Sequence, residues 1–392
     1  MSQARGKNMP LRNWRYLRYN RIMKISKKLV TFFLSLTVSL TAQATINFSD
    51  AIFPELVTSG RALSMGNAYL STANDSASAF YNPAGLGSIR NTHLHLSNFS
   101  LEANKAWVRA GTSGTLFEVF TDIIKGFSMD GSRELLLNNK GTLSFNRIQA
   151  LPNFATRFLS AGYLFSKKNL GYIGTEEGDP YEYATRLDHG PYGAFTLAMM
   201  GGIIKLGVTG TWLFRTEAMG TADPNVTFDL ADSEQNKGSM ILITGGAKLT
   251  LPIMFLPTFS ATLHNAMNTP FTPDAGSAGA PELIKRSLHA GFSLTPQIAN
   301  TVWWRIEVNY KDLTNQYENV AALRKTGLGM EFDFSHVMFI RIGYGDGFGS
   351  AGLGIKTQML ECDLTTYAVD LSDSGFRGEE DRRFMMNISV GI

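Results

Sequence analysis

His93 and His95 are the two residues whose type and spacing most directly suggest chemistry in this sequence. Residues two apart on a β-strand point to the same face, so the two imidazoles could share a metal ion if a third ligand converged on them. The neighbouring sequence offers no third ligand. We therefore interpret the pair as polar side chains on one strand face and expect neither a metal nor another cofactor.

Other catalytic patterns are equally weak. A hydrolase needs a serine or aspartate that converges with a histidine, and no local motif of this kind stands in the sequence. The stretch Gly343-Tyr-Gly-Asp-Gly-Phe-Gly349 lacks the lysine and the strand-to-helix context of a phosphate-binding loop, so it predicts a hairpin turn. The lone Cys362 cannot form an internal disulfide. We expect a protein that is not an enzyme.

The formal charge of +3 hides two parts of opposite sign. Nine of the 36 Lys and Arg residues precede residue 45 and no acidic residue does, so the remainder carries 27 basic against 33 acidic side chains, a net charge of −6. This composition gives no support for a nucleic-acid partner.

The basic N-terminus has the three parts of a secretory signal peptide. A basic segment precedes the apolar core at residues 29–40, and Ala42-Gln-Ala44 forms a small-residue cleavage site. We predict a signal peptide over residues 1–44 with cleavage near Ala44, and Met23 is an alternative true start. A retained signal anchor is the alternative, which the short, Thr- and Ser-rich core disfavours.

A period of two dominates the chain after about residue 90. In residues 301–311, Val302, Trp304, Ile306, Val308 and Tyr310 alternate with mostly charged or polar residues, which predicts a strand with one apolar face. Gly201-Gly202 predicts a hairpin turn between two such strands. Acidic, turn-rich stretches predict loops at 174–179, 222–238, 268–281 and 372–381.

Three features favour a membrane barrel over a secreted β-sandwich. The strands are about 9 to 12 residues long, which suits a tilted strand that crosses hydrocarbon. Trp and Tyr lie toward the strand ends, as at Trp212 and Tyr344. The chain closes on an alternating apolar strand, although Ile392 stands where such barrels usually end in an aromatic residue. Because lipid offers no hydrogen bonds, the sheet must close. We predict an all-β transmembrane antiparallel β-barrel of about 14 strands over residues 91–392.

Two segments depart from this period. Apolar residues at helical spacing in residues 115–127 predict a short amphipathic helix, either a loop helix packed on the barrel rim or a lateral gate or membrane-surface element. Residues 45–90 are rich in small residues, and we predict a plug segment that folds inside the lumen, with Arg61 and Asp75 available as an internal ion pair. A cap on the periplasmic mouth is the alternative. Asp75 or Ser76 can begin a short helix through Phe80, which Asn82-Pro83 would end.

This segment resembles the N-terminal motif of the FadL-like outer-membrane family, which comprises transporters of long-chain fatty acids and aromatic hydrocarbons and a PorV-like branch. The motif is Gly60-Arg-Ala-x-Ser-Met-Gly-Asn-Ala-Tyr69 followed by Asn74-Asp-Ser-Ala-Ser-Ala-Phe-Tyr-Asn-Pro-Ala-Gly-Leu86. By motif position, the resemblance places six residues in the plug and its gate: Arg61, Gly66, Asp75, Asn82, Pro83 and Ala84.

The resemblance implies passive uptake of hydrophobic small molecules, such as long-chain fatty acids, through a plugged lumen with a lateral exit beside a kinked strand. It also implies insertion in the outer membrane of a Gram-negative cell by the barrel assembly machinery, with membrane lipids as neighbours. An apolar solute gains more by returning to the membrane than by crossing an aqueous channel. The alternative, implied by the PorV-like branch, is a non-transporting barrel that interacts with exported proteins in secretion or surface display.

Overall fold

The computed structural model describes residues 56–89, 92–111, 126–372 and 376–391. Its helical elements are short: α2 (Gly60–Ser64), α3 (Ser78–Tyr81), η1 (Pro83–Ser88), α4 (Lys105–Gly111), α6 (Met129–Leu137), η2 (Met200–Gly202) and η3 (Asp232–Glu234). No helix within these ranges is long and apolar enough to cross a membrane. The predicted signal peptide and nearly all of the predicted helix at 115–127 lie outside the described residues.

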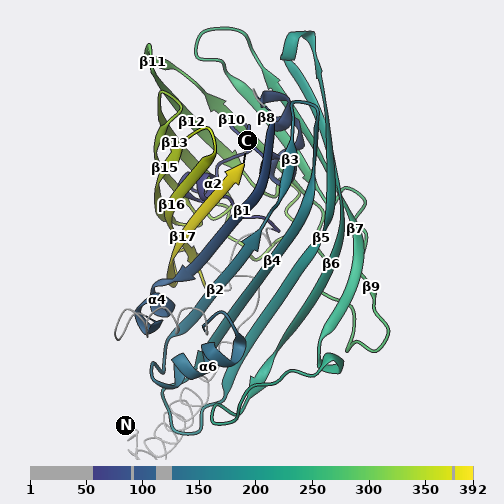
Figure 1. The fold of residues 1–392 in the computed structure, drawn as a ribbon, viewed down its shortest axis with the longest axis vertical. Helices are drawn as coiled ribbons and strands as arrows, with labels where there is room; N and C mark the ends of the chain where they lie inside the picture. Colours follow the sequence, from purple (N-terminus) through teal and green to yellow (C-terminus); the bar gives the residue numbers. More distant parts are fainter. Residues whose placement is uncertain (1–55, 90–91, 112–125, 373–375, 392) are drawn as a thin grey trace, which may run out of the picture. The chain divides into compact units, whose positions relative to one another are not determined.

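The strands form one antiparallel sheet (Figure 1). They are β1 (His93–Asn104), β2 (Leu143–Ala150), β3 (Asn153–Ala155), β4 (Leu159–Ile173), β5 (Tyr181–Met199), β6 (Ile204–Ala222), β7 (Asn236–Thr250), β8 (Thr258–His264), β9 (Thr272–Pro273), β10 (Ser287–Leu294), β11 (Gln297–Ala299), β12 (Val302–Tyr310), β13 (Thr326–Phe334), β14 (Met338–Gly345), β15 (Phe348–Lys356), β16 (Leu360–Asp370) and β17 (Glu380–Gly391). The turns predicted at Gly201-Gly202 and within residues 343–349 join β5 to β6 and β14 to β15.

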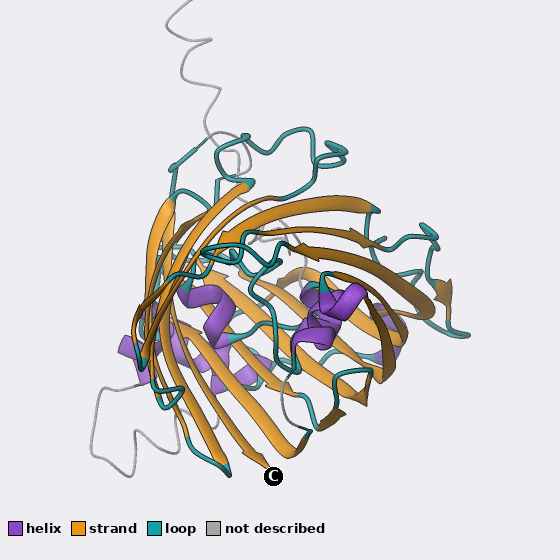
Figure 2. Ribbon diagram, turned by 90° about the horizontal axis from the view of Figure 1, so that it is seen from above, coloured by secondary structure: helices purple, strands orange, loops and turns teal. Residues whose placement is uncertain are grey.

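The sheet closes on itself, because β1 pairs with β17 on one edge and with β2 and β3 on the other. Three short strands extend their predecessors: β3 follows β2, β9 follows β8, and β11 follows β10. The 17 strands therefore occupy 14 positions in the wall of the barrel. Figure 2 shows the strands as a ring with helical turns inside it. The predicted fold class, a barrel of about 14 strands, is confirmed.

The barrel has an apolar outside and a polar inside. On β14, Ile340 and Ile342 are exposed, whereas Arg341 between them is 2% exposed. The same alternation puts Val308 of β12 outside and buries Glu307 and Asn309. This arrangement, the reverse of a soluble protein, is the one a strand adopts when lipid covers one face and a filled lumen covers the other.

The two ends of the barrel differ. At the end where β17 finishes, short turns join β5 to β6, β13 to β14 and β15 to β16. At the opposite end most connections are longer, as between β8 and β10 and between β12 and β13, although a tight turn joins β14 to β15 there. We call this end the long-loop end and the other the short-turn end. The wall is also uneven, since β5 and β6 have 19 residues each and β8 has 7 (Figure 1).

Candidate functional site: the plug and the cavities above it

Residues 56–89, which we call the plug, fill the lumen as predicted. The helix α2 contacts β14 to β17 on one side of the barrel, and η1 contacts β5, β6 and β7 on the other. Small residues such as Ala62, Ala73 and Ala84 are fully buried. Because these side chains are small, the plug backbone lies directly against the strands.

Arg61 of α2 is held by carboxylates. Its Nε and Nη2 donate to the two oxygens of Glu331 at 2.7 and 2.8 Å, and its Nη1 lies 3.7 Å from Asp75. The structure thus contains the predicted pair with Asp75. The closer partner is Glu331 of β13, which also accepts from Arg305 and Arg341. Three guanidinium groups around one buried carboxylate fix this part of the plug to the wall.

Asp75 orients its neighbours within the plug. It accepts a hydrogen bond from Tyr69 at 2.5 Å and one from the main chain of Ala77 at 3.0 Å, just before α3. Burial raises the pKa of the Tyr69 phenol well above its usual value, so the phenol stays protonated and donates to this carboxylate. The helix α3 ends at Tyr81, as the Asn82-Pro83 pair predicts.

Gly66 follows α2 with φ of +64°, a conformation that glycine adopts without strain. Its N–H donates to Ser350 Oγ at 2.9 Å, and that hydroxyl donates to Ser64 O at 3.0 Å. Gly343 of β14 lies against the same turn, where a Cβ atom would collide with the main chain of Gly66. Glycines on both sides therefore allow main chain to pack on main chain.

A second carboxylate from the wall holds the middle of the plug. Glu307 of β12 accepts from the main-chain N–H groups of Leu70, Ser71 and Thr72 at 2.5, 2.8 and 2.8 Å. The Thr72 hydroxyl donates to it at 2.6 Å. Successive N–H groups that converge on one anion form a nest, so this buried charge is matched by oriented dipoles.

The other three predicted residues lie at η1. Asn82 accepts from Ala84 N at 3.1 Å and donates to Leu70 O at 3.0 Å, while Pro83 begins the 3₁₀ turn. Thr196 of β5 donates to Pro83 O at 2.6 Å. Ala84 is fully buried against Gly207 of β6. The six predicted residues therefore form two groups, with Arg61, Gly66 and Asp75 toward β13–β16 and Asn82, Pro83 and Ala84 toward β5–β7.

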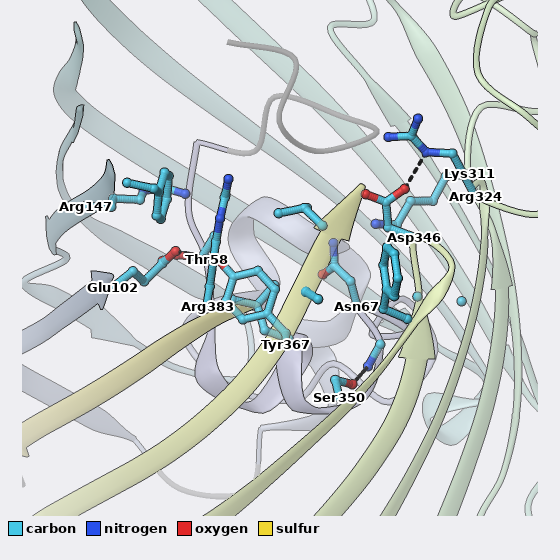
Figure 3. Close-up of a pocket in the computed structure, with 18 of the residues that line it drawn as sticks. Thr58, Asn67, Glu102, Arg147, Lys311, Arg324, Asp346, Ser350, Tyr367 and Arg383 are labelled. Atoms are coloured by element: carbon cyan, nitrogen blue, oxygen red, sulfur yellow. Dashed lines mark hydrogen bonds and ion pairs between the residues drawn. The ribbon is translucent and has the colours of Figure 1, made fainter. Parts of the chain in front are cut away.

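A cavity lies beside the plug toward the long-loop end; we call it cavity 1 (Figure 3). Its cavity volume is about 80 Å³. Its apolar lining includes Leu63, Phe145, Phe348 and Val369. The charged lining residues are Arg147, Lys168, Lys311, Arg324, Arg383, Glu102 and Asp346. Five of these side chains are basic and two are acidic; Arg324 is paired with Asp346, and Arg383 with Asp381 just outside the lining.

A second cavity, cavity 2, lies between the plug and β7, β8 and β10 and has a volume of about 70 Å³. Leu70, Phe80, Leu242 and Ile284 contribute apolar surface, and the lining contains no acidic side chain. Its basic and imidazole side chains are Lys285, Lys311, and the rings of His264 and His289, whose centroids are 4.6 Å apart. Asn67 and Lys311 line both cavities, which therefore adjoin.

The loop between β12 and β13 closes cavity 2 from the long-loop end. The ring of Tyr317 lies 5.1 Å from Lys285 Nζ. Asp312 holds this loop by accepting from Tyr317 N at 3.0 Å, from Gln316 N at 2.9 Å and from Lys325 at 2.9 Å. Burial alone would raise the pKa of Asp312, but these hydrogen bonds outweigh it and lower the pKa, so the carboxylate is charged at neutral pH.

The sequence alone did not show where the wall is kinked. In the structure, two prolines lie at the kinks. Pro152 lies between β2 and β3, where the register of β1 shifts by one residue. Pro191 of β5 follows Gly190, and pairing with β6 skips both positions. Proline within a strand is the signal that could have identified both places, because it removes a ladder donor.

Within the described ranges, no group of three or more His, Cys, Asp or Glu side chains could hold a metal ion. His95 is half-buried on β1, next to Asn153 of β3 in the register of the sheet. The site is therefore defined by a plug and two partly apolar cavities.

These features define a plugged transmembrane β-barrel with two partly apolar internal cavities. The sequence matches no protein-family model and no curated protein. Among solved structures, the chain is similar to the CymD monoaromatic hydrocarbon channel (9% identity, TM-score 0.49, 86% of this chain and 98% of that one). It is also similar to the Ralstonia pickettii toluene transporter TbuX (10%, 0.47, 86% and 98%) and to a Pseudomonas aeruginosa FadL homologue (11%, 0.43, 85% and 97%).

Proposed function

We propose that this protein is an outer-membrane barrel for passive uptake of hydrophobic small molecules, such as long-chain fatty acids. After export and cleavage near Ala44, the barrel assembly machinery would insert it among the membrane lipids. The single observation that carries the proposal is the pair of adjoining, partly apolar cavities inside an otherwise polar lumen. A water-filled pore has no use for partly apolar pockets, whereas apolar side chains beside a few polar groups suit a ligand with an acyl chain or a ring.

The charge of the lining favours a ligand with an anionic end. Lys311 stands where the cavities meet, and the lining of each cavity contains more basic than acidic side chains. In a site of low dielectric constant, a carboxylate gains more from such a lining than it does in water. The apolar residues would cover the rest of the ligand. Arg61, Gly66, Asp75, Asn82, Pro83 and Ala84 would then hold the plug beneath it, and the ligand would leave sideways to the membrane.

Binding of oleate and of oleyl alcohol to the purified barrel tests this proposal. We expect both to bind saturably, and Lys311→Met to weaken oleate binding at least fivefold while it changes oleyl alcohol binding less than twofold. Lys356→Met is the matched control, because Lys356 lines neither cavity and pairs with Glu361 near the short-turn end.

A measurement of oleate uptake across the membrane completes the test. Proteoliposomes should take up oleate faster than protein-free liposomes. Absence of saturable binding and of uptake above the lipid rate would overturn the transport function and leave the alternative, a barrel that interacts with exported proteins.

A further inference from the structure

Two lysines of the wall lie side by side near the short-turn end of the lumen. Lys205 of β6 and Lys248 of β7 face each other directly in the register of the sheet. Both are nearly buried, at 8% and 6% exposed. They stand close to the ends of their strands, since β6 begins at Ile204 and β7 ends at Thr250. Like charges directly opposite each other on one face of a sheet repel, so this pairing requires an explanation.

Both ammonium groups donate to the same oxygen atom of the plug. Lys205 Nζ donates to Ser88 Oγ at 3.0 Å, and Lys248 Nζ donates to it at 3.3 Å. Lys248 Nζ also donates to Ala73 O at 3.2 Å. These two acceptors are neutral. They orient the ammonium groups, but they do not balance the charge of the pair.

The two lysines have no acidic partner. Within the described ranges, neither of them forms an ion pair. Two other lysines of the lumen differ in this respect, because Lys325 pairs with Asp312 at 2.9 Å and Lys356 pairs with Glu361 at 2.9 Å. A buried charge is costly unless an opposite charge accompanies it. An anion from solution would supply the charge that the chain does not provide here.

A third basic side chain borders the same place from the rim of the barrel. Arg157, in the turn between β3 and β4, is exposed and has no ion-pair partner in the described part of the chain. A Cβ atom on Gly202 would lie 3.6 Å from Arg157 Nη2 and 3.8 Å from Lys205 Cε, and no other described atom beyond its chain neighbours is within 4 Å. Ser88 is half-buried. The three cations therefore border a space that is open to water at the short-turn end.

The unused donors at this place suit an anion with several oxygen atoms. A lysine ammonium group has three N–H donors, and a serine hydroxyl has one O–H donor. Lys205 uses one donor and Lys248 uses two, while the Ser88 hydroxyl donates to no described atom. Two, one and one donors are thus left over. A phosphate group accepts hydrogen bonds from several donors at once and carries the negative charge that the lysines lack.

This place is separate from cavity 2. Thr244 of β7 lines cavity 2, and Gly246, two residues further on, lies against Asn82 of the plug. Lys248 follows two residues later on the same face of β7. Asn82 therefore stands between cavity 2 and the two lysines, and an anion bound to them occupies a different site from a ligand in the cavity.

We propose that Lys205, Lys248, Ser88 and Arg157 form a binding site for a phosphate group at the short-turn end of the plug. The phosphate group belongs either to a free phosphate ion or to the head group of an anionic lipid at this rim. When bound, it balances the charge of the lysines and joins η1, through Ser88, to β6 and β7. The site does not depend on the proposed uptake function.

Titration calorimetry of inorganic phosphate into the purified barrel, in detergent at low ionic strength, measures this binding. We expect one saturable site, and Lys205→Met or Lys248→Met to weaken binding at least tenfold. Lys356→Met is the matched control, because this lysine of the same end has its own carboxylate, and it should change the affinity less than twofold. Chloride at the same concentration should give no saturable binding. Absence of saturable phosphate binding to the parent protein would overturn the site.

Hydrogen exchange separates a binding site from lysines that only hold the plug. Saturating phosphate should raise the exchange protection of η1 at least tenfold in the parent protein, because a ligand stabilises the state that it binds. In Lys248→Met, phosphate should change this protection less than twofold. Protection of α2 in the variant should match the parent value and so show that the variant is folded. If phosphate leaves η1 unchanged in the parent, or protects the variant equally, the proposal is wrong.

Lipid nanodiscs distinguish the two sources of the phosphate group. In discs of phosphatidylcholine, added phosphatidylglycerol should weaken binding of inorganic phosphate at least fivefold if a lipid head group occupies the site. It should change binding less than twofold if the natural ligand is a free phosphate ion. Either result supports the site, whereas equal phosphate affinity of the parent protein and Lys248→Met in both kinds of disc would overturn it. Oleate enters none of these measurements, so their failure would leave the proposed uptake function intact.

Discussion

The two halves of the plug are held in the lumen by different forces. In residues 60–69, the α2 half, Arg61 makes a bidentate ion pair with Glu331, a carboxylate that also binds two arginines of the wall. Residues 78–88, the η1 half, contain no charged side chain. This half is held by hydrogen bonds to neutral oxygens, from Thr196, Thr209 and Lys205.

This difference predicts which half of the plug is displaced at the lower cost in free energy. Removing one member of a buried ion pair costs several kcal/mol, because the other charge is left without compensation. A hydrogen bond between neutral groups contributes about 1 kcal/mol, and one from a charged donor such as Lys205 contributes about 1.5–3 kcal/mol. The α2 half is therefore a fixed anchor on β13 and β14, whereas the η1 half, which lies near cavity 2, is the part that can be displaced at modest cost.

The largest effect is expected from Glu331→Ala. This change leaves Arg61, Arg305 and Arg341 facing one another without their common carboxylate, and we expect a loss of about 3–5 kcal/mol in the free energy of unfolding. Arg61→Ala should cost less, because Glu331 keeps two partners. Urea unfolding in lipid vesicles, followed by tryptophan fluorescence, measures both.

Glu380→Ala is the control for this pair of variants. It removes an ion pair with Arg382 in which both side chains are partly exposed, so its effect should stay below about 1 kcal/mol. If Glu331→Ala lowered the free energy of unfolding no more than Glu380→Ala does, the ion pairs of Glu331 would not stabilise the plug.

A matched pair of glycine substitutions makes the comparison sharper. A Cβ on Gly343 would collide with the main chain of Met65 and Gly66, and a Cβ on Gly207 would collide with Pro83 and Ala84. Overpacking of this kind typically costs about 1–3 kcal/mol. We expect Gly343→Ala to lower the free energy of unfolding of the barrel. The α2 half, against which Gly343 lies, is fixed by ion pairs and cannot move aside. Gly207→Ala should instead displace the η1 half and raise single-channel conductance in planar bilayers.

Gly210→Ala is the control, since nothing lies within 4 Å of its Cβ position on the outer face of β6. Its stability and conductance should match the parent protein. Conductance that rises equally in the Gly207 and Gly343 variants would show that the two halves move as one body.

Alternation of side chains predicted the wall because every strand must present one face to lipid and one to the lumen. Residues 301–311 illustrate this, since Val308 lies outside and Glu307 inside as the pattern requires. The plug was predicted from its small residues and its motif, and the pair of Arg61 with Asp75 from their proximity in sequence. Local sequence is sufficient where the two partners are close together in the chain.

The closer partner of Arg61 could not be predicted in the same way. Glu331 lies 270 residues away, and only the pairing of β12, β13 and β14 brings it together with Arg305 and Arg341. Residues 268–281 were predicted as a loop on composition, and most of that stretch has no regular structure. That Phe271 turns inward, into one buried cluster with Met240 and Leu242 of β7, depends on how this loop lies against the sheet, which no local pattern encodes. Register and closure are properties of the whole sheet.

The smallest expected effect concerns a single hydroxyl on the η1 half. Thr209 of β6, 2% exposed, donates to Ala79 O at 2.6 Å, and Thr209→Val keeps the shape while it removes the donor. The loss should be about 1 kcal/mol, which corresponds to a roughly fivefold loss of hydrogen-exchange protection in α3. Protection of α2 should not change, because its anchor is separate.

Thr262→Val is the control for this variant. Thr262 is equally buried, its Oγ1 has no hydrogen-bond partner among the described residues, and its replacement should cost nothing. Equal loss of protection in α2 and α3 would mean that the plug opens as a single unit, and the distinction between its two halves would then not hold.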